Sequence, residues 1–158
     1  AANVGAMLLA FIALLAMFNG FFGWVSDITG LSDLIGSQLS IELVLGWVLA
    51  PVAWLVGVPW QDATNMGSLL GTKIVLNEFV AYGQLASLDT EILSDRTKLI
   101  ALYALCGFAN FSSVGILVSG IAAMSPTRKN DLIEVSFKAL LGATLASCMT
   151  GLVIGIFN

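Results

Sequence analysis

The chain begins with a long run of apolar positions that no charged residue interrupts. Residues 1–26 contain no Asp, Glu, Lys or Arg, and Asn19 is the one strongly polar residue within the segment 4–25. The 22 residues of that segment, at about 1.5 Å per helical residue, cover a hydrocarbon core of about 30 Å. The pattern therefore predicts a transmembrane helix over residues 4–25.

Two further charge-free runs lie in the second half of the chain. One covers residues 99–127 and the other covers residues 139–158. Each is long enough to cross a bilayer as a helix, so we expect membrane-crossing segments over residues 97–125 and 130–157. In the last segment small residues recur at four-residue spacing, namely Gly142, Ala146 and Thr150, and then Gly151 and Gly155. This pattern favours close helix packing over a role in a solute pathway.

Between the first and second spans the pattern is mixed. Residues 26–40 carry Asp, Ser, Thr and Gly residues suited to turns and caps, and we interpret them as a connection. Residues 41–57 are apolar and contain Trp47 and Trp54, but Pro51 lies near their middle. Tryptophan prefers the headgroup level of a bilayer, and a central proline weakens a spanning helix. We therefore predict an interfacial helix over residues 41–57.

The next segment, residues 61–88, is only moderately apolar and contains two charges within its central part. A single straight helix would place Lys73 and Glu78 near the middle of the bilayer. Inserting each charge there costs about 2.5 to 3.5 kcal/mol. A re-entrant hairpin of two half-helices avoids this, with Gly71 as the left-handed stop of the first leg and Asn77 as the N-cap of the second. Irregular backbone at a tip needs protein or a watery cavity around it, so the pattern predicts a site there.

The second predicted span is interrupted by small and polar residues at its centre. Five of them fall within nine positions of a run otherwise rich in Leu, Ile and Ala: Gly107, Asn110, Ser112, Ser113 and Gly115. This composition is typical of a discontinuous helix, whose freed backbone groups and helix ends bind ligands in secondary transporters. The alternative is that the Asn and Ser side chains only hydrogen-bond a neighbouring helix.

The composition agrees with an all-α membrane protein. Of the 158 residues, 58% are hydrophobic and 10% are charged, and the mean hydropathy is +0.97, whereas soluble domains carry charge on about a quarter of their residues. Six basic against ten acidic residues give a net charge of −4, which provides no positive field for nucleic acid. We predict transmembrane helices combined with one re-entrant helical hairpin and one discontinuous helix.

The sequence contains no histidine, which restricts the available chemistry. A His-based catalytic triad, an imidazole proton relay and a His-ligated metal site are excluded. No nucleophile–base pair is visible, so we do not expect an enzyme. Cys106 and Cys148 lie in apolar runs without metal-ligand spacing, and we interpret them as packing residues.

The distribution of basic residues predicts an orientation in the membrane. Residues 1–72 contain neither Lys nor Arg, so by the positive-inside rule residues 26–60 face away from the cytoplasm and the loop 125–131 faces it. Arg96 and Lys98 fall outside on this scheme, beside acids that partly neutralise them. Because the N-terminus has neither Met nor the basic start of a signal peptide, we expect a piece of a longer membrane protein.

Three polar side chains are candidates for binding a solute. Glu78 is a carboxylate at the predicted hairpin tip, and Asn110 and Ser113 are three residues apart, on one side of a helical turn. A carboxylate, an amide and a hydroxyl in a desolvated cavity suit a vicinal diol. The residues alone thus predict a small, neutral, polyhydroxylated solute. The alternative for Glu78 is an ion pair with Lys73.

Two motifs in these segments match a known family. Residues 71–82, GTKIVLNEFVAY, fit the signature G-x-K-x-x-x-N-E-F-V-A-[YFM] of concentrative nucleoside transporters. Residues 106–113, CGFANFSS, resemble the discontinuous penultimate helix of the same family. The resemblance covers essentially the whole chain, which corresponds to the C-terminal part of such a transporter.

The resemblance implies a homotrimeric symporter of the inner or plasma membrane that uses a Na⁺ or H⁺ gradient to accumulate nucleosides. In that family the hairpin Glu and the Asn and Ser of the broken helix hold the ribose, roles that carry over to Glu78, Asn110 and Ser113. Phe108 would line the same pocket. The motif positions Lys73, Asn77 and Gly71 would be structural, serving the hairpin tip.

The family's other hairpin and broken helix, which read the base and bind the coupling cation, are absent from residues 1–158. We therefore expect no cofactor here and a coupling-cation site outside this chain. Residues 1–158 do not determine whether the coupling ion is Na⁺ or H⁺, or whether the transported base is a purine or a pyrimidine. Alternating access needs both repeats, so the fragment alone should not transport. The alternative function is a gate-like or scaffold membrane protein that shares the hairpin but moves no nucleoside.

Overall fold

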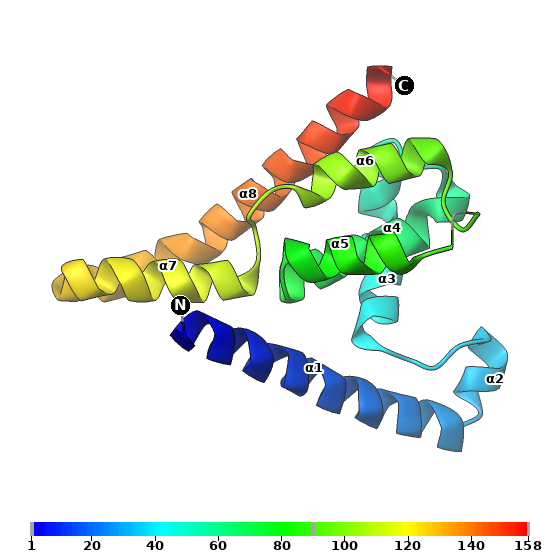
Figure 1. The fold of residues 1–158 in the computed structure, drawn as a ribbon, viewed down its shortest axis with the longest axis horizontal. Helices are drawn as coiled ribbons and strands as arrows, with labels where there is room; N and C mark the ends of the chain where they lie inside the picture. Colours follow the sequence, from blue (N-terminus) through cyan, green and yellow to red (C-terminus); the bar gives the residue numbers. More distant parts are fainter. Residues whose placement is uncertain (1, 90, 158) are drawn as a thin grey trace.

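The computed structural model describes residues 2–89 and 91–157, and all regular elements in these ranges are helices (Figure 1). The side chains of residues 1–8 and 11 lie outside the description. The elements in chain order are α1 (Ala2–Ile28), α2 (Leu31–Ile35), α3 (Ile41–Leu55), α4 (Trp60–Val75), α5 (Glu78–Ser87), α6 (Asp95–Leu105), α7 (Phe111–Met124), the 3-10 helix η1 (Pro126–Arg128) and α8 (Lys129–Phe157).

Several helices have the length or composition of membrane segments. Among the described residues, the segment Pro126–Phe157 is long and apolar enough to cross a membrane. Helices α3 and α4 meet that condition only as a pair, and they are bent by 117° at the residues between them. Ile12–Ile28 of α1 and Phe111–Met124 of α7 are shorter apolar helices. Helix α1 covers the predicted span 4–25, whose first residues have side chains outside the description.

Polar side chains join α1 to the start of α3. Asn19 accepts a hydrogen bond from the amide of Ile41 at 2.9 Å through Oδ1, and its Nδ2 donates to Oε2 of Glu42 at 2.8 Å. The connection between them contains the short helix α2, where the sequence predicted only turns. Gly30 and Gly36 flank α2 with φ of 68° and 75°, a left-handed backbone that favours glycine.

Helices α3 and α4 pack with their backbones in close contact. A Cβ added to Gly67 of α4 would overlap the carbonyl oxygen of Gly46 in α3 and lie 3.0 Å from the amide nitrogen of Ala50. Helix α3 continues through Pro51 to Leu55. Because glycines allow this approach, α3 and α4 form one tightly packed pair.

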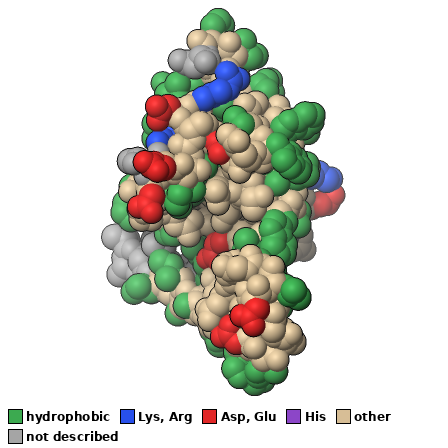
Figure 2. Space-filling model, turned by 90° about the vertical axis from the view of Figure 1, so that its right-hand side faces the viewer, with side chains coloured by type: hydrophobic (Ala, Val, Ile, Leu, Met, Phe, Trp, Pro, Cys, Tyr) green, Lys and Arg blue, Asp and Glu red, His purple; other side chains and the backbone are tan. Residues whose placement is uncertain are grey.

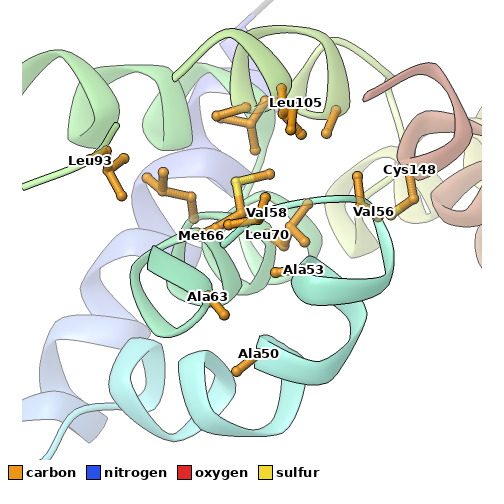
Figure 3. Close-up of a cluster of buried hydrophobic side chains, with 14 of the residues drawn as sticks. Ala50, Ala53, Val56, Val58, Ala63, Met66, Leu70, Leu93, Leu105 and Cys148 are labelled. Carbon is orange, nitrogen blue, oxygen red and sulfur yellow. The ribbon is translucent and has the colours of Figure 1, made fainter. Parts of the chain in front are cut away.

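The buried core lies between α3, α4, α5, α6 and α8, and Figure 3 shows many of its side chains. Its members are small and medium-sized apolar side chains, among them Ala53, Val58, Met66, Leu70, Leu105 and Cys148. Helix α8 closes against α6 through Gly151, where a Cβ would lie 2.9 Å from Cβ of Ala104, and Gly155 packs against Ile100. This confirms the predicted close packing for Gly151 and Gly155, whereas Gly142 has no neighbour within 4 Å.

Helix α8 satisfies its own hydroxyl groups. Thr144, Ser147 and Thr150 each donate to the carbonyl oxygen four residues earlier, at 2.9, 2.9 and 3.1 Å. Helix α7 runs beside the first half of α8 (Figure 1), and their Phe111 and Phe137 rings meet edge to face at 6.5 Å.

Many apolar side chains lie on the outside of the molecule. Figure 2 shows them distributed over one face, with charged side chains in small separate groups. Trp24, Trp47, Trp54 and Trp60 are all exposed, as are Leu141 and Met149 of α8. An apolar surface of this extent needs lipid or further protein to cover it.

Candidate functional site

The break between α4 and α5, where the sequence predicts a hairpin tip, lies at residues 76 and 77. Helix α4 ends where Leu76 departs from helical geometry, with φ of −99° and ψ of −89°. Asn77 is extended, and its Oδ1 accepts a hydrogen bond from the amide of Val80 at 2.9 Å. The predicted N-cap at Asn77 is confirmed, and it makes Glu78 the first residue of α5.

The predicted stop at Gly71 is wrong. Gly71 lies inside α4, and its φ is not among the positive values, which in the described residues belong to Gly30, Gly36 and Gly57. A Cβ at Gly71 would lie 2.6 Å from Cβ of Leu45, so the glycine makes room for α3. Its role is close helix packing rather than termination of the helix.

The chain is non-helical between α6 and α7, at residues 106–110. Asn110 caps α7, because its Oδ1 accepts from the amide of Ser113 at 2.6 Å. Ser113 returns the interaction, with its Oγ accepting from the amide of Asn110 at 3.2 Å and donating to the Asn110 carbonyl at 2.7 Å. This reciprocal capping fixes the first turn of α7 and the direction of the Asn110 side chain.

A side-chain hydrogen bond joins the start of α5 to the start of α7. Nδ2 of Asn110 donates to Oε2 of Glu78 at 3.0 Å, and the two residues are 32 positions apart in the sequence. In Figure 1 the first turn of α7 accordingly lies next to the first turn of α5. Asn110 is 1% exposed and Glu78 is half-buried, so the carboxylate is the more accessible partner.

Ser113 and Phe108 lie within three positions of Asn110 in the sequence. Ser113 is buried and its hydroxyl is used in the α7 cap, so the structure places it against Asn110 and not against Glu78. Phe108 is exposed, and with Ser113 it lines an apolar hollow of about 250 Å³ between α7 and α8. The structure thus brings Glu78 and Asn110 into contact. Ser113 is hydrogen-bonded to Asn110, and Phe108 lines the neighbouring hollow.

Lys73 is buried and does not neutralise Glu78 directly. Its Nζ donates to the carbonyl oxygen of Ala104 at 2.8 Å, near the end of α6. Among the described residues no salt bridge joins Lys73 to Glu78. The arrangement argues against the ion-pair alternative, and among the described residues the Glu78 carboxylate accepts from the Asn110 amide.

Two residues that contact α6 have no role in the sequence-based prediction. Asp62 accepts three hydrogen bonds from the start of α6, and the Tyr82 hydroxyl donates to the carbonyl oxygen of Leu102 at 2.5 Å. In the sequence, Tyr82 could have been singled out by its place in the motif. Asp62 had no signal beyond being an acidic residue in the first turn of a helix. In the part of the chain that the structure describes, no three Cys, Asp or Glu side chains cluster as metal ligands.

Gly107 permits the non-helical segment to approach α8. A Cβ there would overlap Oγ of Ser147 and lie 3.0 Å from its Cβ. We expect Gly107→Ala to destabilise the full-length protein by about 1 to 3 kcal/mol through overpacking, measured by thermal unfolding in detergent. A second substitution, Ser147→Ala, should recover part of the loss.

Gly120→Ala in α7 is the matched control, because no atom lies within 4 Å of the added Cβ. Equal unfolding temperatures for the Gly107 and Gly120 variants would contradict this account of the contact.

Comparison with known proteins gives matches along the whole chain. Residues 1–155 match the family model described as "Na+ dependent nucleoside transporter C-terminus". The chain is 44% identical over 157 residues to the uncharacterized transporter YutK of Bacillus subtilis, covering 99% of this chain and 37% of that protein. It is 42% identical over 161 residues to the nucleoside permease NupC of Helicobacter pylori, again covering 99% of this chain and 37% of the permease.

A mammalian relative and solved structures extend the match. Sodium/nucleoside cotransporter 1 of Mus musculus is 39% identical over 169 residues, which cover 98% of this chain and 25% of the cotransporter. The structure of CNTnw in an inward-facing substrate-bound state superimposes with a TM-score of 0.83 at 42% identity, covering 99% of this chain and 37% of CNTnw. A CNTnw variant in an intermediate state superimposes with a TM-score of 0.88 at 43% identity, covering 99% of this chain and 38% of the variant. The chain thus spans less than two fifths of these relatives.

Proposed function

Because the chain belongs to the concentrative nucleoside transporter family, we propose that it is the C-terminal part of a cation-coupled nucleoside symporter and holds the ribose of the substrate. The family model covers residues 1–155. The observation that carries the proposal is the 3.0 Å hydrogen bond between Asn110 Nδ2 and Glu78 Oε2, which joins the start of α5 to the start of α7. Both residues lie in the motifs that resemble the family.

A ribose hydroxyl can replace the direct bond between the two side chains. Oδ1 of Asn110 is committed to the α7 cap, so its Nδ2 faces Glu78 as a donor. A hydroxyl placed between them donates to the carboxylate and accepts from the amide, so each partner keeps its hydrogen bond. The hydrogen bond to the carboxylate is the stronger of the two, and Glu78 therefore contributes more than Asn110 to the binding of this hydroxyl.

The helix arrangement supports a membrane placement for the site. We propose that α4 and α5 form a re-entrant hairpin and that α6 and α7 form one discontinuous transmembrane helix interrupted at residues 106–110. The irregular backbone of the tip and of the interruption meet at Glu78 and Asn110, which agrees with the rule that such backbone is tolerated at membrane depth only inside protein or beside a watery cavity.

The remaining features of the transporter are assigned by family membership. We propose an inner or plasma membrane location and a homotrimer in which α1 belongs to the scaffold. The coupling cation, Na⁺ or H⁺, and the recognition of the base are assigned to residues outside this chain. Phe108, exposed beside Asn110, packs on the bound nucleoside in this scheme.

The test is uptake of radiolabelled nucleosides by the full-length protein in vesicles, with and without a Na⁺ gradient and with and without a pH gradient. We expect accumulation of at least one nucleoside above its external concentration under one of the two gradients. A properly inserted protein that accumulates no nucleoside under either gradient would overturn the proposal and favour a scaffold or gate-like role.

Ser113 can act through the cap or through the ligand, and the substrate distinguishes the two. We expect Ser113→Ala to weaken transport of a ribonucleoside more than transport of an analogue that lacks a ribose hydroxyl, because Ser113 supports the amide that faces that hydroxyl. The measurement is the apparent KM for uridine and for its dideoxy analogue. Equal changes for both substrates would show that Ser113 is purely structural.

A further inference from the structure

The start of α6 is bound by a single carboxylate from α4. Oδ2 of Asp62 accepts hydrogen bonds from the amide of Ser94 at 3.1 Å, from its hydroxyl at 2.7 Å and from the hydroxyl of Thr97 at 2.6 Å. Asp62 is 5% exposed. Ser94 is itself the N-cap of α6, so the negative charge lies at the positive end of that helix dipole.

The end of α6 is bound by a single ammonium group from the same helix. Nζ of Lys73 donates to the carbonyl oxygen of Ala104 at 2.8 Å, and Lys73 is 1% exposed. This carbonyl belongs to the last turn of α6, where no intrahelical donor follows, so a positive charge lies at the negative end of the dipole. Asp62 and Lys73 thus complement opposite ends of one helix.

The spacing of the two charges equals the length of the helix that they bind. Asp62 and Lys73 are 11 positions apart in α4, which is about 16 Å and three turns, so both lie on the same face of the helix. Helix α6 has 11 residues and is therefore about 16 Å long. Because start meets start and end meets end, α4 and α6 run in the same direction and in register.

The second leg of the hairpin adds a contact at the same end of α6. The Tyr82 hydroxyl of α5 donates to the carbonyl oxygen of Leu102, two residues before the carbonyl bound by Lys73. Both legs of the hairpin therefore hold the last turn of α6, immediately before residues 106–110. That segment carries Phe108 and Asn110, the residues that meet Glu78.

We propose that Asp62 and Lys73 are positioning residues that set the register of α6 against the hairpin and thereby place Asn110 opposite Glu78. A slip of α6 by one helical turn would move residues 106–110 by about 5.4 Å, more than a hydrogen bond can follow. The register itself is a property of these contacts, whereas its consequence for transport rests on the proposed function.

The transport experiment compares the full-length protein with the variants Asp62→Asn and Lys73→Met. We expect the apparent KM for uridine to rise about tenfold, with a smaller change in maximal rate per folded molecule, and the preference for uridine over its dideoxy analogue to fall toward one. Asp62→Glu and Lys73→Arg keep the charges and should retain part of that preference. Asp95→Asn and Lys138→Met are matched controls, since both residues lie on the surface in pairs that do not involve α4.

A distance measurement tests the register without any substrate. Nitroxide labels are placed at Ala86→Cys on α5 and Leu102→Cys on α6, in a background with Cys106→Ala and Cys148→Ala, because the structure exposes both labelled positions. We expect one narrow distance in the parent and a second population, shifted by about one helical turn of 5.4 Å, in the Asp62→Asn/Lys73→Met protein. If that protein does not fold, each single variant is measured instead.

Unchanged label distances and unchanged substrate preference in all folded variants would overturn the inference and reduce both charges to a stabilising role. A parent protein that transports no nucleoside would overturn the proposed function, and the label distances would still decide whether the two charges set the register.

Discussion

Replacing Glu78 with Gln in the full-length protein is expected to weaken nucleoside uptake by about 10- to 150-fold. In the parent, the Glu78 carboxylate accepts a hydrogen bond from Nδ2 of Asn110 at 3.0 Å. The glutamine amide keeps the size of the side chain and still offers an oxygen to that donor. It removes the charge that strengthens a hydrogen bond from the ribose hydroxyl, and a hydrogen bond to a charged group is worth about 1.5 to 3 kcal/mol. With about 1.4 kcal/mol per tenfold change in affinity, the loss should appear as a raised KM for uridine.

Glu91→Gln is the matched control for this variant, because Glu91 is an exposed acid in the loop that follows α5. It should transport as the parent does. Both variants should insert and assemble to the same extent, which quantification in the membrane and size-exclusion chromatography measure. Uptake by Glu78→Gln equal to that of the control would remove Glu78 from the substrate site.

A change at Gly67 should act on the fold rather than on the site. We expect Gly67→Ala to lower the free energy of unfolding by about 3 kcal/mol, the upper end of overpacking effects, because the added Cβ would meet the backbone of α3. It would overlap the carbonyl oxygen of Gly46 and lie 3.0 Å from the amide nitrogen of Ala50, and neither atom can rotate away. Thermal unfolding of the purified full-length protein measures the effect.

Gly83→Ala is the control for Gly67, since Gly83 lies within helix α5 and no atom is found within 4 Å of its added Cβ. Alanine is the better helix former by about 1 kcal/mol, so this variant should be neutral or slightly stabilised. If the two variants unfold at the same temperature, the α3–α4 contact does not limit stability.

A local signal in the sequence predicted one helix start. Asn77 was identified as an N-cap because a capping side chain bonds to backbone only three residues away, and it caps α5. Asn110 was expected as a polar interruption and a solute ligand, and its capping of α7 is a finding of the structure. The two polar interruptions were then expected to face each other, since each needs shielding from lipid, and Glu78 does contact Asn110. Helix caps and polar interruptions depend on short stretches of chain, so the local sequence predicts them.

The sequence did not predict the roles of residues whose partners lie far away along the chain. Gly71 reads as a helix stop, yet it fits against Leu45, 26 positions earlier, and the helix continues past it. Asp62 reads as an ordinary acid in a first turn, and its partners are at positions 94 and 97. Nothing near either residue in the sequence indicates which helix packs against it, so composition and periodicity could not assign those roles.

The order in which the contacts of α4 become available has a consequence for biosynthesis. All side-chain partners of Asp62 and Lys73 described above lie 31 to 35 positions downstream. While the ribosome is still completing the hairpin, both charges are without these partners, and in the proposed re-entrant placement Lys73 lies near the tip, where an unpaired charge is expensive. Chains emerge from the ribosome in order, N-terminal segments first. The hairpin is therefore expected to enter the bilayer only after residue 104 has left the exit tunnel, together with α6 rather than ahead of it.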